Sequence, residues 1–110
     1  MRKPRQVKVL STEHFDILFS KESTFSAKII AENAENIFNK VISSFETNQK
    51  LRIIVVISPD SDELFVEYSP YPYNRIVVYE GVPRDSSIDD TDSLLEKFEL
   101  EVVKAVFFFF

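Results

Sequence analysis

The sequence predicts a small α+β domain in which one mixed, largely antiparallel sheet of four to five short strands carries two packed helices. The length of 110 residues allows one domain, and a hydrophobic content of 45% is enough for a single core. Several short segments have the composition of strands, and two longer segments carry apolar residues at every third or fourth position. This alternation of strands and helices is typical of a sheet with helices packed against it. We therefore expect a single domain over residues 1–110.

The first half of the chain predicts two strands followed by a helix. Val7–Leu10 forms a short extended segment, and His14–Phe19 alternates between apolar and other residues, as a half-buried strand does. Ser20 offers a side-chain oxygen as the N-cap of the next element. Residues 24–45 then change to a helical period with one apolar stripe. The stripe consists of Ala27, Ile30, Ala34, Ile37, Phe38, Val41 and Phe45.

The second half predicts three strands and a second helix. Leu51–Ile57 is apolar on both faces apart from Arg52, which is typical of an interior strand. Leu64–Tyr68 and Arg75–Tyr79 are further strands, joined by a connection that two prolines keep extended. An acidic cluster precedes the last helix, as the helix dipole favours. The cluster is Asp89, Asp90 and Asp92, and the predicted apolar stripe is Leu95, Phe98, Val102 and Val106.

Charge and composition exclude several classes of function. The formal net charge of −5 argues against a nucleic-acid partner, which normally needs a positive surface. The one basic cluster, Arg2, Lys3, Arg5 and Lys8, is interpreted as a solvated terminus rather than a binding arm. The absence of cysteine excludes disulfides and thiolate zinc sites. Since no signal peptide or membrane-spanning apolar run is recognisable, we expect a cytoplasmic protein.

Residues with catalytic or metal-binding chemistry are few. His14 is the only histidine, so it cannot join a second histidine in a metal site, and a surface or hydrogen-bonded role is favoured over catalysis. Asp60, Asp62 and Glu63 lack the glycine and the distant glutamate of a calcium loop, which favours a solvated turn. The residue types alone therefore predict no catalytic set, no metal site and no cofactor.

Two long segments carry a resemblance to a known family. Val55–Asp62 and Tyr68–Tyr79 resemble the strands and loops before the active-site helix of peptidase-MA-like zinc metallopeptidases of the gluzincin type. The likeness extends over residues 6–106 and implies the N-terminal lobe of such an enzyme. In that family the next helix carries His-Glu-x-x-His, in which two histidines bind zinc and the glutamate activates the metal-bound water.

The resemblance places a degenerate form of this motif on the last helix. Glu101 matches the general-base position, whereas Leu100 and Lys104 stand where the two histidines should be. Leucine has no lone pair to give, and a lysine cation repels a metal ion. The family's third ligand comes from a later helix that this chain does not include. We therefore expect no zinc site and no enzyme activity; Glu101 could instead pair on the helix surface with Lys97 or Lys104.

The sequence leaves two hypotheses for function. One is a truncated, non-catalytic metallopeptidase-like domain. The other is a small protein-interaction module that binds a partner through its Tyr/Pro loop, a sheet edge or its C-terminal apolar helix. Packing is favoured over recognition for the Tyr/Pro loop, whereas four consecutive phenylalanines cannot all face one core and predict self-association. The candidate interaction residues are Tyr68, Tyr71, Tyr73, Phe107, Phe108, Phe109 and Phe110, the last four forming an apolar tail.

Overall fold

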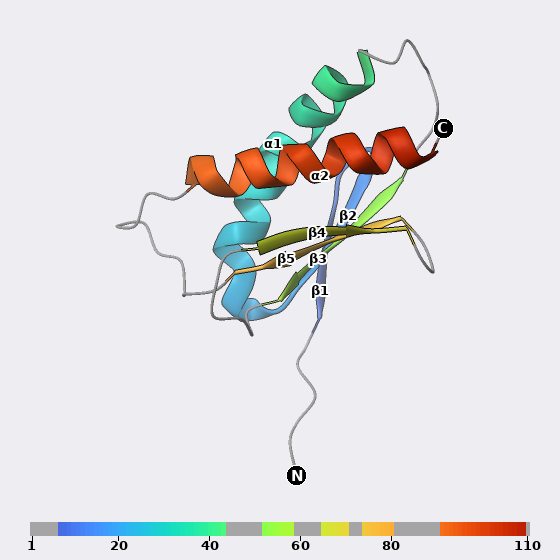
Figure 1. The fold of residues 1–110 in the computed structure, drawn as a ribbon. Helices are drawn as coiled ribbons and strands as arrows, with labels where there is room; N and C mark the ends of the chain where they lie inside the picture. Colours follow the sequence, from blue (N-terminus) through green and yellow to red (C-terminus); the bar gives the residue numbers. More distant parts are fainter. Residues whose placement is uncertain (1–6, 44–51, 59–64, 71–73, 81–90, 110) are drawn as a thin grey trace.

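The strands and helices follow the predicted order along the chain. The computed structural model describes residues 7–43, 52–58, 65–70, 74–80 and 91–109 (Figure 1). The elements are β1 (Lys8–Ser11), β2 (Phe15–Phe19), the short 3₁₀ helix η1 (Lys21–Ser23), α1 (Thr24–Ser43), β3 (Ile53–Ser58), β4 (Phe65–Ser69), β5 (Arg75–Tyr79) and α2 (Thr91–Phe109).

The strands form one mixed sheet in the order β1-β2-β3-β5-β4. The central strands β2, β3 and β5 run parallel to one another, and the outer strands β1 and β4 are each antiparallel to their neighbour. The predicted mixed sheet with two helices is confirmed, although two of its four strand pairs are parallel, so it is less antiparallel than predicted. The segment predicted as an interior strand supplies β3, at the centre of the sheet. The register pairs Phe15 with Ile53 and Val55 with Ile76, so buried side chains of neighbouring strands lie side by side.

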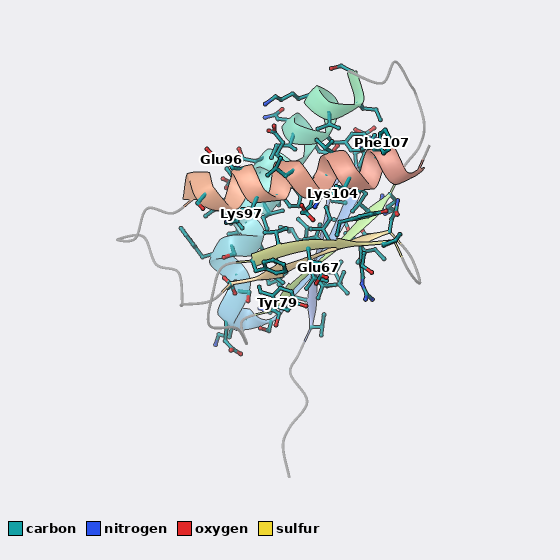
Figure 2. All side chains as sticks on the ribbon, in the orientation of Figure 1. Glu67, Tyr79, Glu96, Lys97, Lys104 and Phe107 are labelled. Carbon is teal, nitrogen blue, oxygen red and sulfur yellow. The ribbon has the colours of Figure 1, made fainter. Side chains whose placement is uncertain are left out.

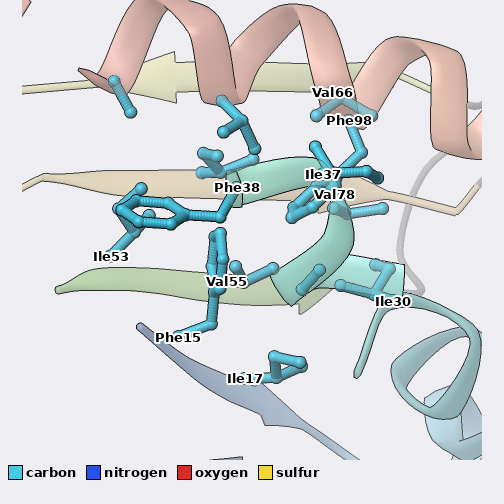
Figure 3. Close-up of a cluster of buried hydrophobic side chains, with 14 of the residues drawn as sticks. Phe15, Ile17, Ile30, Ile37, Phe38, Ile53, Val55, Val66, Val78 and Phe98 are labelled. Carbon is cyan, nitrogen blue, oxygen red and sulfur yellow. The ribbon is translucent and has the colours of Figure 1, made fainter. Parts of the chain in front are cut away.

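Helices α1 and α2 both pack on one face of this sheet (Figure 1). The predicted alternation in β2 is confirmed, because Phe15, Ile17 and Phe19 are buried. Phe15 contacts both helices: its ring meets that of Phe38 edge-on at 6.0 Å between centroids and that of Phe98 at 5.7 Å. Figure 3 shows these side chains within the core. The α1 stripe is confirmed at Ala27, Ile30, Ala34, Ile37, Phe38 and Val41, whereas Phe45 lies outside the described residues.

Two details of the predicted helices are wrong. The α2 stripe includes Leu94 as a fully buried residue, and Leu95 is only half-buried at the margin of the core. The rest of the predicted stripe is confirmed, because Phe98, Val102 and Val106 are fully buried; α2 packs against α1 as well as the sheet, so its buried side also includes Leu94. The Ser20 hydroxyl makes no N-cap bond: it is buried and has no hydrogen-bond partner among the described residues. Instead, the Ser20 carbonyl accepts the Ser23 N–H at 2.9 Å and starts η1.

The second face of the sheet is covered by none of the helices that the structure describes. Strand β3, in the segment predicted as apolar on both faces, has one buried face and one half-buried face, and β5 has the same pattern. Within the described ranges, neither helix is long and apolar enough to cross a membrane. The sheet therefore has one face covered by α1 and α2, and the strands β1 and β4 form its two edges.

Candidate functional site

The segment that the resemblance aligned with the zinc motif lies in the middle of α2, next to the edge strand β4. Leu100 and Lys104 are one turn apart, and both side chains are exposed. Glu101 has turned inward and is only 7% exposed. Its Oε1 accepts the backbone N–H of Tyr68 at 2.9 Å, and its Oε2 lies 3.0 Å from the Lys104 Nζ. The Glu101 carboxylate is therefore engaged by both the helix and the strand.

This geometry corrects the interpretation of Glu101 as a helix-surface residue. The ion pair with Lys104 is present and was one of the two alternatives proposed. The carboxylate is nevertheless buried, and it accepts a hydrogen bond from a backbone N–H of the edge strand β4. Edge strands expose unpaired backbone groups that invite further strands to pair with them. Glu101 thus closes part of the β4 edge, a structural role that the sequence did not indicate.

An apolar row runs along the outward side of α2. It consists of Leu100, Val103 and Phe107, whose exposed fractions are 64%, 39% and 69%. Their spacing of three and four residues places them on one side of the helix, opposite the buried side that includes Phe98 and Ala105. Of the predicted tail, Phe107 is the residue whose side chain the structure describes, and it points away from the core.

Charged side chains flank this row. Figure 2 labels Glu96 and Phe107 along one side of α2, and Lys97 and Lys104 along the other. Leu100 also lines a groove of about 580 Å³ between α1 and α2. In this groove Lys40 Nζ binds Glu99 Oε1 at 3.2 Å and links the two helices. The row is therefore an apolar strip with charged borders, continuous with a shallow groove.

The Tyr/Pro patch is only partly described. Tyr68 is half-buried, packs against the core and donates its hydroxyl to Asn74 Oδ1 at 2.5 Å. Burial raises the pKa of this hydroxyl. These contacts favour the packing interpretation at Tyr68. Tyr71 and Tyr73 lie outside the described residues, as do Phe110 and the acidic turn of Asp60, Asp62 and Glu63.

A polar cluster surrounds the only histidine, where the β1–β2 turn meets α1. The His14 ring stacks on Phe38 at 4.0 Å, and its Nδ1 lies 2.6 Å from Glu35 Oε1. Glu35 Oε2 accepts the His14 backbone N–H at 2.9 Å and the Thr12 hydroxyl at 2.5 Å. Burial by itself raises the pKa of Glu35, but the hydrogen bonds from Thr12 and His14 outweigh it and leave the pKa below its ordinary value. A hydrogen-bonded role for His14 was one of the two favoured alternatives.

Arg52, just before β3, also holds the turn before β2 in place. Its guanidinium donates to Asp16 Oδ1 at 2.7 Å and to the Glu13 carbonyl at 2.9 Å. The hydrogen bond from Arg52, supported by one from Ser11, lowers the pKa of Asp16 to about 2. The side chains that meet at this turn therefore come from β1, β2, β3 and α1.

A third polar cluster is buried at the start of α1. Glu80, which follows β5, is buried, and its two carboxylate oxygens accept the hydroxyls of Ser23 and Ser26. The Glu80 backbone N–H donates to the Ser58 carbonyl at 2.9 Å. The carboxylate therefore ties the end of β5 to the beginning of α1.

Sequence reasoning missed Glu35, Glu80 and the inward position of Glu101. Each of these side chains bonds a residue more than 20 positions away, and such contacts depend on how α1 and α2 cross the sheet. One signal was present: Glu35 lies beside the apolar residues Ala34 and Phe38, at the margin of the α1 stripe. A carboxylate there is close enough to the sheet to reach a strand.

Comparison with known proteins adds one relative. No protein-family model matches the chain, and no solved structure matches it. The chain is similar to an uncharacterized protein from Treponema pallidum (strain Nichols), with 29% identity over 101 residues. The match covers 89% of this chain and 10% of the relative, so the chain spans about a tenth of that protein's length. In the relative, the corresponding segment is one part of a much longer polypeptide.

Proposed function

We propose that this chain is a non-catalytic domain of the metallopeptidase-lobe type that binds a second copy of itself through the apolar row of α2. The observation that carries the proposal is the exposure of Leu100, Val103 and Phe107 on one side of a single helix. Burying a large apolar side chain stabilises a complex by about 1.5–3 kcal/mol relative to leaving it exposed. Adjacent exposed apolar residues with a charged border are typical of a protein-binding surface.

The other two proposed binding modes have less support. Pairing of a strand with the β4 edge competes with Glu101, which already accepts the Tyr68 N–H there. The Tyr/Pro loop is represented by Tyr68, whose ring packs against the core of its own domain. The α2 row makes no comparable contribution to the core, since its side chains lie opposite the buried stripe.

The family resemblance supplies a reason for an exposed face at this position. In the metallopeptidase pattern, Leu100 and Lys104 replace two zinc ligands that the catalytic half of the enzyme would cover. Both side chains are exposed here, and the apolar row includes Leu100. The length of the Treponema relative is consistent with such an arrangement, because most of that polypeptide lies outside the matched segment.

The non-catalytic part of the proposal depends on the chemistry of α2. Leu100 has no ligand atom, Lys104 is a cation paired with Glu101, and Glu101 accepts a backbone hydrogen bond. None of these three groups is arranged to bind zinc or to activate water.

A concentration series recorded by NMR tests the binding surface, with a second copy of the chain serving as the apolar partner. As the protein concentration rises, we expect the side-chain signals of Leu100, Val103 and Phe107 to shift together, while those of the exposed Val9 stay in place. Concentration-independent signals along α2 would contradict the proposal, and so would shifts confined to the sheet.

A further inference from the structure

Three residues at the β1–β2 turn offer ligand atoms that lie close to one another. Glu13, His14 and Glu35 each supply one such atom, and these atoms all lie within 4.8 Å of one another. Zinc binds nitrogen and oxygen ligands at about 2.0–2.2 Å, so two ligands on opposite sides of one ion are about 4 Å apart. Small rotations of the Glu13, His14 and Glu35 side chains would bring the three ligand atoms to bonding distance from one ion. We propose that Glu13, His14 and Glu35 form a binding site for a divalent transition-metal ion of the zinc class.

Two of the three ligands are already held in place. Stacking on Phe38 and the 2.6 Å contact with Glu35 fix the His14 ring. The Glu35 carboxylate is fixed in turn by the His14 backbone N–H and the Thr12 hydroxyl. Nδ1 of His14 faces Glu35 Oε1, so an ion bound by both side chains takes the place of the proton between them, and metal binding releases that proton. This pair therefore has the form of an oriented histidine ligand.

The third proposed ligand, Glu13, lies on the solvent-exposed side of the site. Glu13 is exposed, and its carboxylate makes no hydrogen bond or ion pair with any residue in the described ranges. Its backbone carbonyl is held by Arg52, so the position of the residue is fixed while its side chain is free to turn. The site thus combines a rigid, half-buried pair with one mobile carboxylate at its mouth.

The ligand set indicates which ions fit. One imidazole and two carboxylates suit zinc and its neighbours in the transition series, whereas calcium and magnesium prefer oxygen ligands alone. The two carboxylates balance the charge of a divalent ion, and the Arg52 guanidinium, which binds the Glu13 carbonyl, is already paired with Asp16. Three protein ligands leave at least one coordination position for water. This site lies at the β1–β2 turn and on α1, and it does not involve the α2 row.

The composition of the chain makes the site directly measurable. His14 is the only histidine and there is no cysteine, so the imidazole nitrogen signals in an NMR spectrum report on this site alone. We would titrate the untagged full chain with zinc chloride. The His14 ring signals are expected to move and to saturate at one equivalent, and the same amount of calcium chloride should leave them unchanged.

Substitutions separate a three-residue site from incidental binding to the imidazole. His14→Gln should weaken zinc binding at least about tenfold, since loss of even an outer partner of a metal ligand costs that much. Glu13→Gln should also weaken it severalfold without disturbing the fold, because the Glu13 side chain has no partner to lose. The matched control is Glu32→Gln, which removes the same charge from an exposed position on α1. Ring signals that do not move in a large excess of zinc would overturn the proposal, and so would equal zinc affinities of the Glu13→Gln and Glu32→Gln variants.

Discussion

The Glu101 carboxylate of α2 accepts the backbone N–H of Tyr68 in β4 at 2.9 Å, so a helix side chain closes part of a sheet edge. The sequence resemblance led us to expect this residue at the general-base position of a metallopeptidase motif. In this chain it bonds the strand beside it, and Lys104 pairs with its second oxygen. At the opposite edge of the sheet, β1 is mostly exposed. The two edges therefore differ in how far they can accept another strand.

Removal of the Glu101 carboxylate should destabilise the domain. Glu101→Ala leaves the Tyr68 N–H without its charged acceptor, and a hydrogen bond to a charged group contributes about 1.5–3 kcal/mol to the free energy of unfolding. Glu101→Gln keeps an acceptor oxygen and should cost less. Urea denaturation measures both values, and hydrogen exchange at the Tyr68 amide should be faster in the alanine variant.

As a control, Lys104→Ala should cost only about 0–1 kcal/mol, because the lysine side chain is largely exposed. Equal losses for Glu101→Ala and Lys104→Ala would show that the edge bond is unimportant.

The stability of the domain should depend on the two serine hydroxyls that donate to the buried Glu80 carboxylate. Ser26→Ala removes one hydroxyl and leaves a buried carboxylate oxygen without its partner, which costs about 1–3 kcal/mol. Ser43→Ala is the control, since the Ser43 hydroxyl donates to a carbonyl at the exposed end of the same helix. Urea denaturation of the two variants gives the comparison. A Ser26→Ala variant as stable as Ser43→Ala would mean that the Glu80 carboxylate is satisfied in another way.

The pair of Asp16 and Arg52 should make stability depend on pH in the acid range. The hydrogen bond from Arg52 lowers the pKa of Asp16 from 3.8 to about 2 in the folded protein. Because the folded pKa is the lower of the two, the ionised carboxylate stabilises the fold above pH ~4, and this stabilisation is lost as the pH falls towards 2. Carboxyl-carbon NMR should give a midpoint near 2 for Asp16.

Arg52→Gln should return the Asp16 midpoint towards its ordinary value and flatten the dependence of stability on pH below 4. Lys8→Gln is the charge-matched control, since Lys8 is exposed at the sheet edge. If the Asp16 midpoint is the same in both variants, the guanidinium is not the cause of the low pKa.

The parts of the fold that depend on one neighbouring layer could be predicted from the sequence. β2 alternates cleanly because one of its faces is buried under the helices, and the α1 stripe is correct from Ala27 to Val41. The position of α2 was less accurate, because this helix packs against the sheet and α1 at once. Phe98, Val102 and Val106 are buried as predicted, but Leu94 is fully buried and Leu95 is only half-buried.

The polar clusters could not be predicted, for a different physical reason. Glu35 and Glu101 occur among charged residues whose local pattern indicates a solvated surface, and Glu80 lies at the end of a strand, before a glycine. Their partners lie on strands or helices far along the chain, so only the crossing of the elements brings them together. Of the exposed row of α2, only the outward position of Phe107 could be expected from the sequence, because four successive phenylalanines cannot all face one core; the exposure of Leu100 and Val103 was not predicted.

Sedimentation velocity over a range of protein concentrations tests the proposed binding surface most directly. The full chain should associate as its concentration rises, whereas a chain with Leu100→Gln, Val103→Gln and Phe107→Gln should stay monomeric with its fold unchanged. Glutamine retains helix propensity, and the three side chains contribute little to the core. A matched variant with Val9→Thr and Phe65→Thr, which loses exposed apolar residues from the sheet, should associate as the original chain does. A full chain that remains monomeric at millimolar concentration, or a glutamine variant that associates equally well, would contradict a role for α2 in binding.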